Sequence, residues 1–239
     1  MKTVLITGSS RGIGSACVRL FAEKGYNVAL NYNKSDSAAT ALENEFENVA
    51  KFCADVSDKN QVDAMVSAVK SRFGSVDILI NNAGIAQSKL FSDITDEDFD
   101  QMVSVHLKGA FNCTQAVLSD MIDKKSGRII NISSIWGITG ASCEVHYSMV
   151  KSGLIGFTKA LAKELAPSGI TVNAIAPGVV DTDMMSGFTA DEIKEIEKEI
   201  PLGRLASPSE IALSALFLAE DGGDYITGQV ISPNGGIVI

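Results

Sequence analysis

Short apolar runs alternate with longer helical patterns along almost the whole chain, and this alternation constrains the fold more than any other feature. Several runs are apolar nearly throughout, as strands covered on both faces of a sheet should be. Strands that alternate with helices favour right-handed crossovers and a parallel, doubly wound sheet. Strands are expected at residues 3–7, 28–32, 50–54, 76–81, 128–133, 170–176 and 229–233.

The helical patterns fill the intervals between these runs, and no linker or repeat divides them. Helices are expected from about Ile13 to Gly25 and over 36–47, 58–73, 96–123, 146–166, 190–199 and 208–219. The pattern over 96–123 is expected to break or bend near Gly109. Residues 181–207 show no strand character and follow a strand, so they are expected to form a mobile substrate lid beside the ligand crevice. We therefore predict a single α/β domain over residues 1–239, with about seven strands and helices on both faces.

The charge balance excludes some classes of partner. The formal net charge is −9, and no basic block offsets it. An acidic surface argues against nucleic acid and against an anionic membrane surface. No apolar stretch reaches the length needed to span a bilayer, and the N-terminus lacks a signal-peptide pattern. Together with four scattered cysteines, which suggest neither a metal site nor a disulfide framework, these features predict a cytoplasmic protein.

The first strand is followed directly by the glycine-rich stretch TGSSRGIG. Gly8, Gly12 and Gly14 would let the backbone turn sharply and approach a pyrophosphate, which would then lie at the N-terminus of the first helix. A plain turn between strand and helix is the alternative, although such a turn rarely needs three glycines. The pattern predicts a Rossmann-type dinucleotide-binding domain.

The end of the second strand bears on the choice between NAD and NADP. NAD-binding proteins usually place a carboxylate there to bind the ribose 2′-hydroxyl. This chain has NYNKS, with no carboxylate before Asp36. Arg11 and Lys34 would attract a 2′-phosphate, so the cofactor is expected to be NADP(H), although Lys34 is also consistent with a solvated loop lysine.

Further motifs follow in order: NNAG at 81–84, ISS at 132–134, YSMVK at 147–151 and PGVVDTDM at 177–184. With the glycine loop, their order and spacing make the whole chain similar to the short-chain dehydrogenase/reductase family. Within that family, it most resembles the 3-oxoacyl-[acyl-carrier-protein] reductases. The resemblance implies a homotetramer built through the helices at 96–123 and 146–166 and the C-terminal segment.

The resemblance also implies roles for individual residues. Ser134, Tyr147 and Lys151 would be catalytic, and no metal is implied. The cofactor would contact Gly8, Ser10, Arg11, Gly12, Ile13, Gly14, Asn33, Lys34, Asp55, Val56, Asn82, Ala83, Gly84, Tyr147, Lys151, Pro177, Gly178, Val180 and Thr182.

The chemistry of a carbonyl reduction explains why a tyrosine and a lysine belong together. Hydride transfer to a ketone leaves negative charge on oxygen, and an acid must supply a proton there. Tyr147 and Lys151 stand i, i+4 on a predicted helix, so their side chains are neighbours. The charge of Lys151 is expected to lower the pKa of Tyr147, while Ser134 would donate a hydrogen bond to the same substrate oxygen.

The chain departs from the family pattern at one catalytic position. His106, in SVHLKG, stands where an asparagine is usual. Its main-chain carbonyl could still hold a proton-relay water, and its imidazole could add a group that titrates near neutral pH. The alternative is a tolerated substitution that packs or bonds locally.

A second departure concerns the acyl carrier. An acidic carrier protein needs cations near the site entrance. Lys124, Lys125 and Arg128 form a small basic cluster that could dock it, but Ser168 replaces an arginine common in carrier-protein reductases.

The expected function is therefore NADPH-dependent reduction of a 3-oxoacyl thioester, bound to acyl carrier protein, in fatty-acid or polyketide-like synthesis. Reduction of a free small ketone, alcohol or sugar is one alternative. A nucleotide-binding regulator that has lost turnover is an alternative of another class, which the intact Ser134, Tyr147 and Lys151 argue against.

Overall fold

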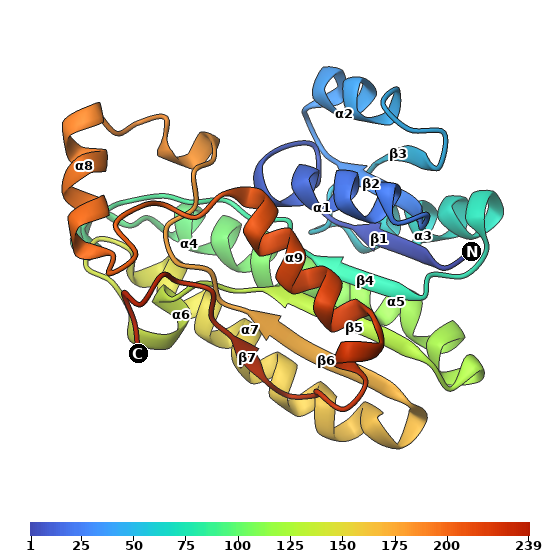
Figure 1. Ribbon diagram of the computed structural model, residues 1–239. Coiled ribbons are helices and arrows are strands. Elements are labelled where there is room, and N and C mark those ends of the chain that lie inside the picture. The colour runs from blue at the N-terminus through green and yellow to red at the C-terminus, as the bar shows by residue number, and fades with distance from the viewer.

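A computed structural model describes residues 1–239, and its central feature is a seven-stranded sheet whose strands are all parallel. The strand order is β3-β2-β1-β4-β5-β6-β7, and Figure 1 shows the arrowheads pointing toward one edge. The predicted doubly wound parallel sheet is therefore confirmed. The strands are β1 (Thr3–Ile6), β2 (Asn27–Tyr32), β3 (Val49–Cys53), β4 (Ile78–Asn81), β5 (Gly127–Ile132), β6 (Ile170–Ile175) and β7 (Val230–Ile231).

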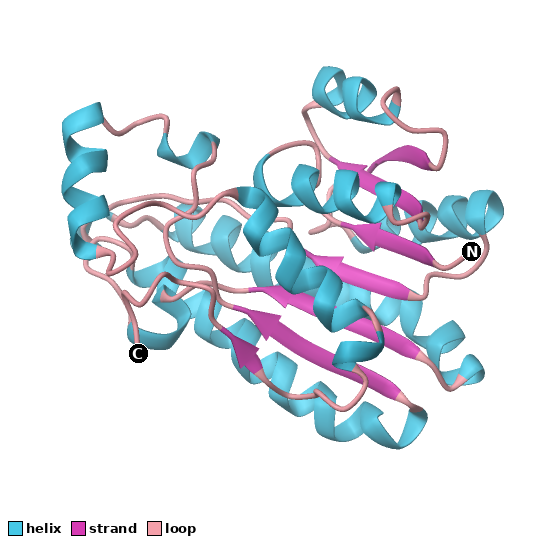
Figure 2. Cartoon of the chain, in the orientation of Figure 1, coloured by secondary structure: helices cyan, strands magenta, loops and turns pink.

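Helices cover both faces of this sheet (Figure 2). Neighbouring residues of a strand point to opposite faces, and the core divides accordingly: Val4 and Ile6 of β1 join one hydrophobic cluster, and Leu5 joins the other. The first cluster contains buried side chains of α1 and α9, and the second those of α3, α5 and α7. The α-helices are α1 (Gly12–Glu23), α2 (Asp36–Glu43), α3 (Lys59–Phe73), α4 (Asp96–Val103), α5 (Gly109–Lys124), α6 (Trp136–Thr139), α7 (Val145–Leu165), α8 (Ala190–Glu199) and α9 (Pro208–Ala219).

The predicted break near Gly109 is present as a π-helical turn over Ser104–Lys108, between α4 and α5. Gly109 donates its backbone N–H to the Ser104 carbonyl across this turn. Gly109 also packs closely against the loop between β3 and α3, because a Cβ on Gly109 would lie 2.7 Å from a Val56 side-chain carbon. The wider turn carries His106, which is buried. Short π segments inside helices often occur at functional sites.

Two predicted elements are shorter than expected by three residues or more. The pattern over 36–47 forms a helix only as far as Glu43. Beyond it, the backbone N–H groups of Glu45 and Phe46 donate to the carbonyls of Leu42 and Glu43, which forms isolated turns. The last strand spans only Val230–Ile231, where it pairs with Ala174 and Ile175 at the sheet edge. None of the helices is both long and apolar enough to cross a membrane.

The chain order creates a crevice at one place on the sheet. From β1 the chain proceeds to β2 and β3 on one side, whereas β4 begins the series on the other side. Loops that follow β1 and β4 therefore diverge at the carboxyl edge, which is where open α/β sheets bind ligands. The segment after β6 contains α8, which buries no residue and stands apart beyond this edge in Figure 1. Its mobility as a lid stays a prediction.

Candidate active site

A cleft of about 570 Å³ lies at the carboxyl edge, where the loops after β1, β2, β3 and β4 meet. Most of the residues expected to contact the cofactor line it: Gly8, Ser10, Arg11, Gly12, Ile13, Asn33, Lys34, Asp55, Val56, Asn82, Ala83, Gly84 and Thr182. The expected contacts that do not line it are Gly14, Tyr147, Lys151, Pro177, Gly178 and Val180. The cofactor contacts expected from the sequence did not include the other lining residues: Asn31, Tyr32, Ser35, Ala54, Ser57, Ile85, Gln101, Ser104, Val105, Asp183 and Met184.

The glycine loop needs glycine for steric reasons. Gly8 has φ +59°, and a Cβ on it would lie 2.6 Å from Ala83 Cα. Gly12 has φ +54°, and a Cβ on Gly14 would lie 2.6 Å from Ser9 Cα. Side chains at these positions would strain or displace the loop. The backbone therefore forms a narrow cradle at the N-terminus of α1, which fits a dinucleotide pyrophosphate.

Asn31 holds this loop in place, although its position inside a strand gave no signal of such a role. Its Oδ1 accepts a hydrogen bond from the Gly8 N–H at 3.1 Å, and its Nδ2 donates to the Ala54 carbonyl at 3.0 Å. One buried amide thus joins the ends of β1, β2 and β3.

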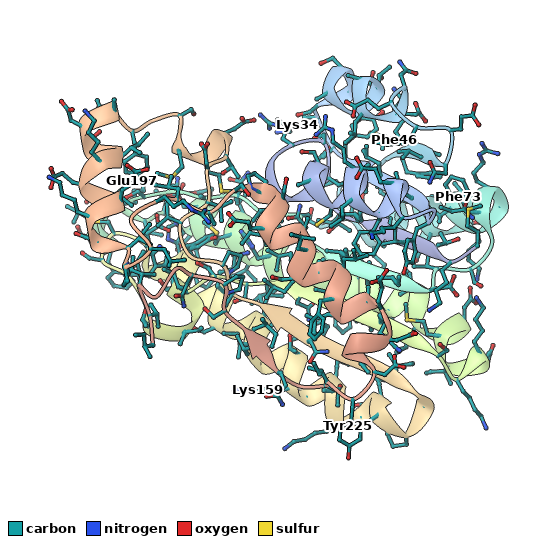
Figure 3. All side chains as sticks on the ribbon, viewed as in Figure 1. Lys34, Phe46, Phe73, Lys159, Glu197 and Tyr225 are labelled. Atoms are coloured by element: carbon teal, nitrogen blue, oxygen red, sulfur yellow. The ribbon has the colours of Figure 1, made fainter.

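The cleft is lined by two cations from the loops after β1 and β2, and β2 itself contributes no free carboxylate. Arg11 and Lys34 both line it, and Figure 3 places Lys34 on the loop between β2 and α2. Asp36, the first carboxylate after β2, accepts hydrogen bonds from the Tyr32 hydroxyl and, at 2.8 Å, from Lys51 Nζ. Arg11 also pairs with Asp183 at 3.5 Å across the cleft.

Ser134 lies in the turn that follows β5, and the backbone N–H of Trp136 donates to its Oγ at 3.2 Å. The preceding Ser133 donates its hydroxyl to the Lys151 carbonyl at 2.9 Å, which fastens this turn to α7. The backbone of Ile135 bonds to the Pro177 carbonyl at 3.0 Å. Pro177 and its neighbours therefore follow β6 beside the Ser134 turn rather than inside the main cleft.

Tyr147 and Lys151 are neighbours on the first turns of α7, with Lys151 Nζ 5.4 Å from the centroid of the tyrosine ring. Lys151 is buried and donates a hydrogen bond to the Ile132 carbonyl at 2.8 Å. Burial lowers the pKa of Lys151 to about 7. Burial, with Glu144 adding to it, raises the pKa of Tyr147 to about 12, and a hydrogen bond with Ser134 opposes that rise.

The sequence predicts that Lys151 lowers the pKa of Tyr147, whereas the net shift of the Tyr147 pKa is upward because of burial. Removing both groups from water disfavours their charged forms, and this desolvation is the largest effect on each pKa. The consequence is a neutral tyrosine, which is the form that can donate a proton.

His106 lies between the cleft and the tyrosine. Its Nε2 is 2.8 Å from the Ile85 carbonyl oxygen and 3.1 Å from the Ile85 nitrogen, and its ring meets that of Tyr147 edge-on at 5.6 Å between centroids. Burial, followed by the nearby charge of Lys151, lowers the pKa of His106 to about 3. The hypothesis of an imidazole that titrates near neutral pH is therefore not supported, because the buried ring stays neutral.

The predicted basic cluster is not at the site entrance of its own chain. Lys124 ends α5, and Arg128 is the second residue of β5, so both lie at the amino edge of the sheet, opposite the cleft. Lys124 pairs with Asp77 at 2.7 Å, and Arg128 pairs with Asp224. The expectation of a docking cluster beside the entrance fails within one chain, because the intervening strand separates the two edges.

A nucleotide cleft that adjoins a tyrosine–lysine pair is the arrangement of a dehydrogenase or reductase of the short-chain class. The chain belongs to the short-chain dehydrogenase/reductase family, since residues 8–238 match the family model described as "Enoyl-(Acyl carrier protein) reductase". No group of three or more His, Cys, Asp or Glu side chains is placed to hold a metal ion.

Individual relatives match nearly the whole chain. An uncharacterized oxidoreductase, YmfI, from Bacillus subtilis is 45% identical over 98% of this chain and 98% of that protein. The 3-oxoacyl-[acyl-carrier-protein] reductase FabG of Staphylococcus aureus is 44% identical over 99% of this chain and 98% of its own length. FabG of Chlamydia trachomatis is 42% identical over 99% of this chain and 97% of its own length.

Proposed function

We propose that this protein is a cytoplasmic 3-oxoacyl-[acyl-carrier-protein] reductase, which reduces a 3-oxoacyl thioester to the 3-hydroxyacyl product with NADPH in fatty-acid or related synthesis. The single observation that carries the proposal is the convergence of Ser134, Tyr147 and Lys151 beside the dinucleotide cleft. Full-length similarity to FabG proteins supports the choice of substrate.

In the proposed reaction, bound NADPH supplies the hydride. Tyr147 donates its phenolic proton to the substrate oxygen as negative charge develops there. Ser134 orients that oxygen by a hydrogen bond and stabilises the developing charge. Lys151, held by the Ile132 carbonyl, stabilises the tyrosinate that forms and returns a proton to it. The neutral His106 holds the Ile85 backbone beside the tyrosine and carries no charge itself.

The preference for NADPH rests on the charged residues of the cleft. Arg11 and Lys34 line it, and Asp36 is already engaged by Tyr32 and Lys51. An anionic 2′-phosphate would meet two cations there and no free β2 carboxylate. The experiment is a binding titration with NADPH and NADH, in which replacement of Lys34 and Arg11 by alanine should weaken NADPH binding far more than NADH binding.

We propose a homotetramer, as the family resemblance implies, and this assembly changes how a carrier could dock. Helices α5 and α7 expose apolar side chains, including Phe111 and Met149. Helix α5 runs from the site edge, at Gly109, to the opposite edge, at Lys124. If two copies pack through these helices in antiparallel fashion, Lys124 and Lys125 of one copy lie near the site edge of the other and can meet an acidic carrier there.

A free ketone is a second candidate, because two of the cations at the site edge of one chain already have carboxylate partners. Lys89 pairs with Asp98, and Arg11 pairs with Asp183. The first turn of α4 and the exposed helix α8 add further carboxylates. An acidic carrier would be repelled by this surface unless a neighbouring copy supplies cations.

The test measures NADPH oxidation with a 3-oxoacyl group on acyl carrier protein, with the same group on coenzyme A, and with small free ketones. The Tyr147→Phe variant should lose about 100- to 10,000-fold in kcat, as expected for removal of a general acid. A preference for free ketones would favour the second candidate. Tight NADPH binding without turnover on any ketone would instead indicate a nucleotide-binding regulator.

A further inference from the structure

The only two histidines of the chain hold the same short segment. This segment, residues 85–89, follows β4 at the carboxyl edge, and Ile85 lines the cleft. His106 reaches the Ile85 backbone from the π-helical turn. His146, from the first turn of α7, places its Nε2 2.9 Å from Gln87 Oε1. Both imidazoles are buried, yet only His106 has a part in the proposed reaction.

His146 is the end of a directed chain of hydrogen bonds. Gln87 donates its Nε2–H to Asp98 Oδ1 at 2.7 Å, and Asp98 also accepts from Lys89 Nζ and from the Thr95 backbone N–H. Bonds from Lys89 and Gln87 hold the pKa of the Asp98 carboxyl well below its usual range, so it is an ionised acceptor.

The ionised Asp98 carboxylate determines, through Gln87, which ring nitrogen of His146 carries the proton. An ionised carboxylate has no proton to donate, so Gln87 must turn its NH₂ toward Asp98 and its oxygen toward His146. His146 must then donate, and its proton lies on Nε2. Its Nδ1 is buried and has no hydrogen-bond partner in the protein, which agrees with this tautomer.

This chain of hydrogen bonds joins three elements that surround Tyr147, the candidate acid. His146 directly precedes Tyr147 on α7, Gln87 belongs to the 85–89 segment, and Asp98 lies in the first turn of α4. Glu144, at the N-cap of α7, makes no side-chain cap, so this end of the helix lacks the usual local support. Lys89 also donates its backbone N–H to the Cys143 carbonyl at 2.8 Å, just before the helix.

We propose that His146 is a positioning residue, whose bond through Gln87 to Asp98 sets where the Tyr147 ring stands relative to the 85–89 segment. The consequence for turnover rests on the proposed function. The direction of the hydrogen-bond chain does not, because it follows from the carboxylate and the amide alone.

The kinetic test compares four single variants. His146→Met and Gln87→Met remove the bond with similar side-chain volume, and His146→Gln keeps a donor at similar reach. Ser88→Ala is the matched control, because Ser88 is exposed on the same segment and its side chain makes no hydrogen bond. Thermal stability and the Kd for NADPH are measured for each protein. All rates are compared at a temperature at which every variant is folded.

If this hydrogen bond positions Tyr147, its loss displaces the acid. His146→Met and Gln87→Met are then each expected to lower kcat by about tenfold or more, with NADPH affinity unchanged. The double variant should lose no more than either single variant, because both break one bond. His146→Gln should retain most of the wild-type kcat, and Ser88→Ala all of it. Unchanged kcat in the two methionine variants, or losses that multiply in the double variant, would overturn the proposal. If His146→Met does not fold, Gln87→Met decides.

A spectroscopic arm separates this proposal from the proposed function. The ¹⁵N shifts of His146, assigned by comparison with His106→Gln, should report a proton on Nε2. The ¹³Cζ signal of Tyr147 should move in Gln87→Met and not in Ser88→Ala. A proton on Nδ1, or a Tyr147 signal indifferent to Gln87, would refute the positioning role. Both signals can be read even if the protein reduces no 3-oxoacyl thioester.

Discussion

Gly137 and Lys151 approach so closely that a Cβ on Gly137 would lie 2.7 Å from the carbonyl carbon of Lys151. The same Cβ would lie 2.8 Å from Ser133 Oγ, which itself bonds to the Lys151 carbonyl. From the other side, Ser152 donates its hydroxyl to the Gly137 carbonyl at 2.8 Å. These contacts pack α6 closely against α7. Because Ser134 lies just before α6 and Tyr147 lies on α7, this packing fixes the distance between the two residues.

Gly137→Ala is therefore expected to lower both stability and turnover. Its methyl group has no space, so the free energy of unfolding should fall by about 1–3 kcal/mol, as for other overpacked sites. The turn that carries Ser134 should shift, and kcat should fall with little change in NADPH affinity. Urea denaturation and steady-state kinetics measure the two effects.

Gly156→Ala is the control for this prediction. Gly156 lies in the interior of α7, and within one chain a Cβ there would meet nothing within 4 Å. Alanine should raise helix stability by up to about 1 kcal/mol and leave kcat unchanged. Equal losses in the two variants would contradict the steric account of Gly137.

Stability should depend on pH through Lys151. Its pKa is about 7 in the folded protein, well below the value of about 10.4 expected when unfolded. Between these values the unfolded chain binds a proton that the folded chain does not, so the free energy of unfolding rises with pH. The burial cost is complete below about pH 7 and fades toward pH 10.

Lys151→Met removes this group, so the variant should gain stability over wild type by up to a few kcal/mol near neutral pH and lose that advantage as pH rises. Denaturant titrations between about pH 7 and 9 measure the difference, in a range below the titration of tyrosine. Parallel curves for the two proteins would show that Lys151 keeps an ordinary pKa.

His106→Asn should leave the shape of the pH–rate profile unchanged. With a pKa of about 3, the imidazole of His106 is neutral throughout the range in which the enzyme would be assayed. The kcat profiles of the two proteins between about pH 6 and 9 should therefore superimpose after scaling, even if the absolute rates differ. An ionisation in that range that only the wild type shows would restore a proton-transfer role for the ring.

Carrier docking across a subunit contact predicts a substrate-specific defect. Reversing charge at Lys124 and Lys125, each to glutamate, should raise KM for the carrier-bound substrate about tenfold and leave KM for the coenzyme A thioester nearly unchanged. Lys24→Glu, on an exposed site that follows α1, is the control for a charge reversal elsewhere on the surface. An equal rise in KM for both substrates would argue against docking and for general damage to the site.

The local pattern of the chain predicted the architecture well. Apolar runs flanked by helical patterns located each strand of the sheet, and the interruption near Gly109 is a π-helical turn. The errors in the predicted elements concern where helices and strands end, because local preferences are weak there. The helix expected over 36–47, for example, stops at Glu43. The predicted parallel sheet already implies that Lys124, which precedes a strand, lies on the edge opposite the cleft, and the docking hypothesis did not apply this rule.

The hydrogen-bond chain from His146 was not predicted, since its members stand far apart in sequence. Gln87 and His146 are separated by 59 positions, and neither belongs to a motif. The sequence around a buried histidine that precedes a tyrosine does not show whether the histidine only packs in the core or also donates a hydrogen bond to an amide. Only the position of Asp98 reveals its direction.

The sequence by itself determined the alternation of strands and helices, the glycine loop and the i, i+4 spacing of Tyr147 and Lys151, because each depends on residues close together in the chain. The tertiary structure alone decided the ionisation of the site. Burial lowers the pKa of Lys151 and raises that of Tyr147, against the attraction that their spacing implies. Desolvation depends on every atom packed around a group, and those atoms come from many separate segments.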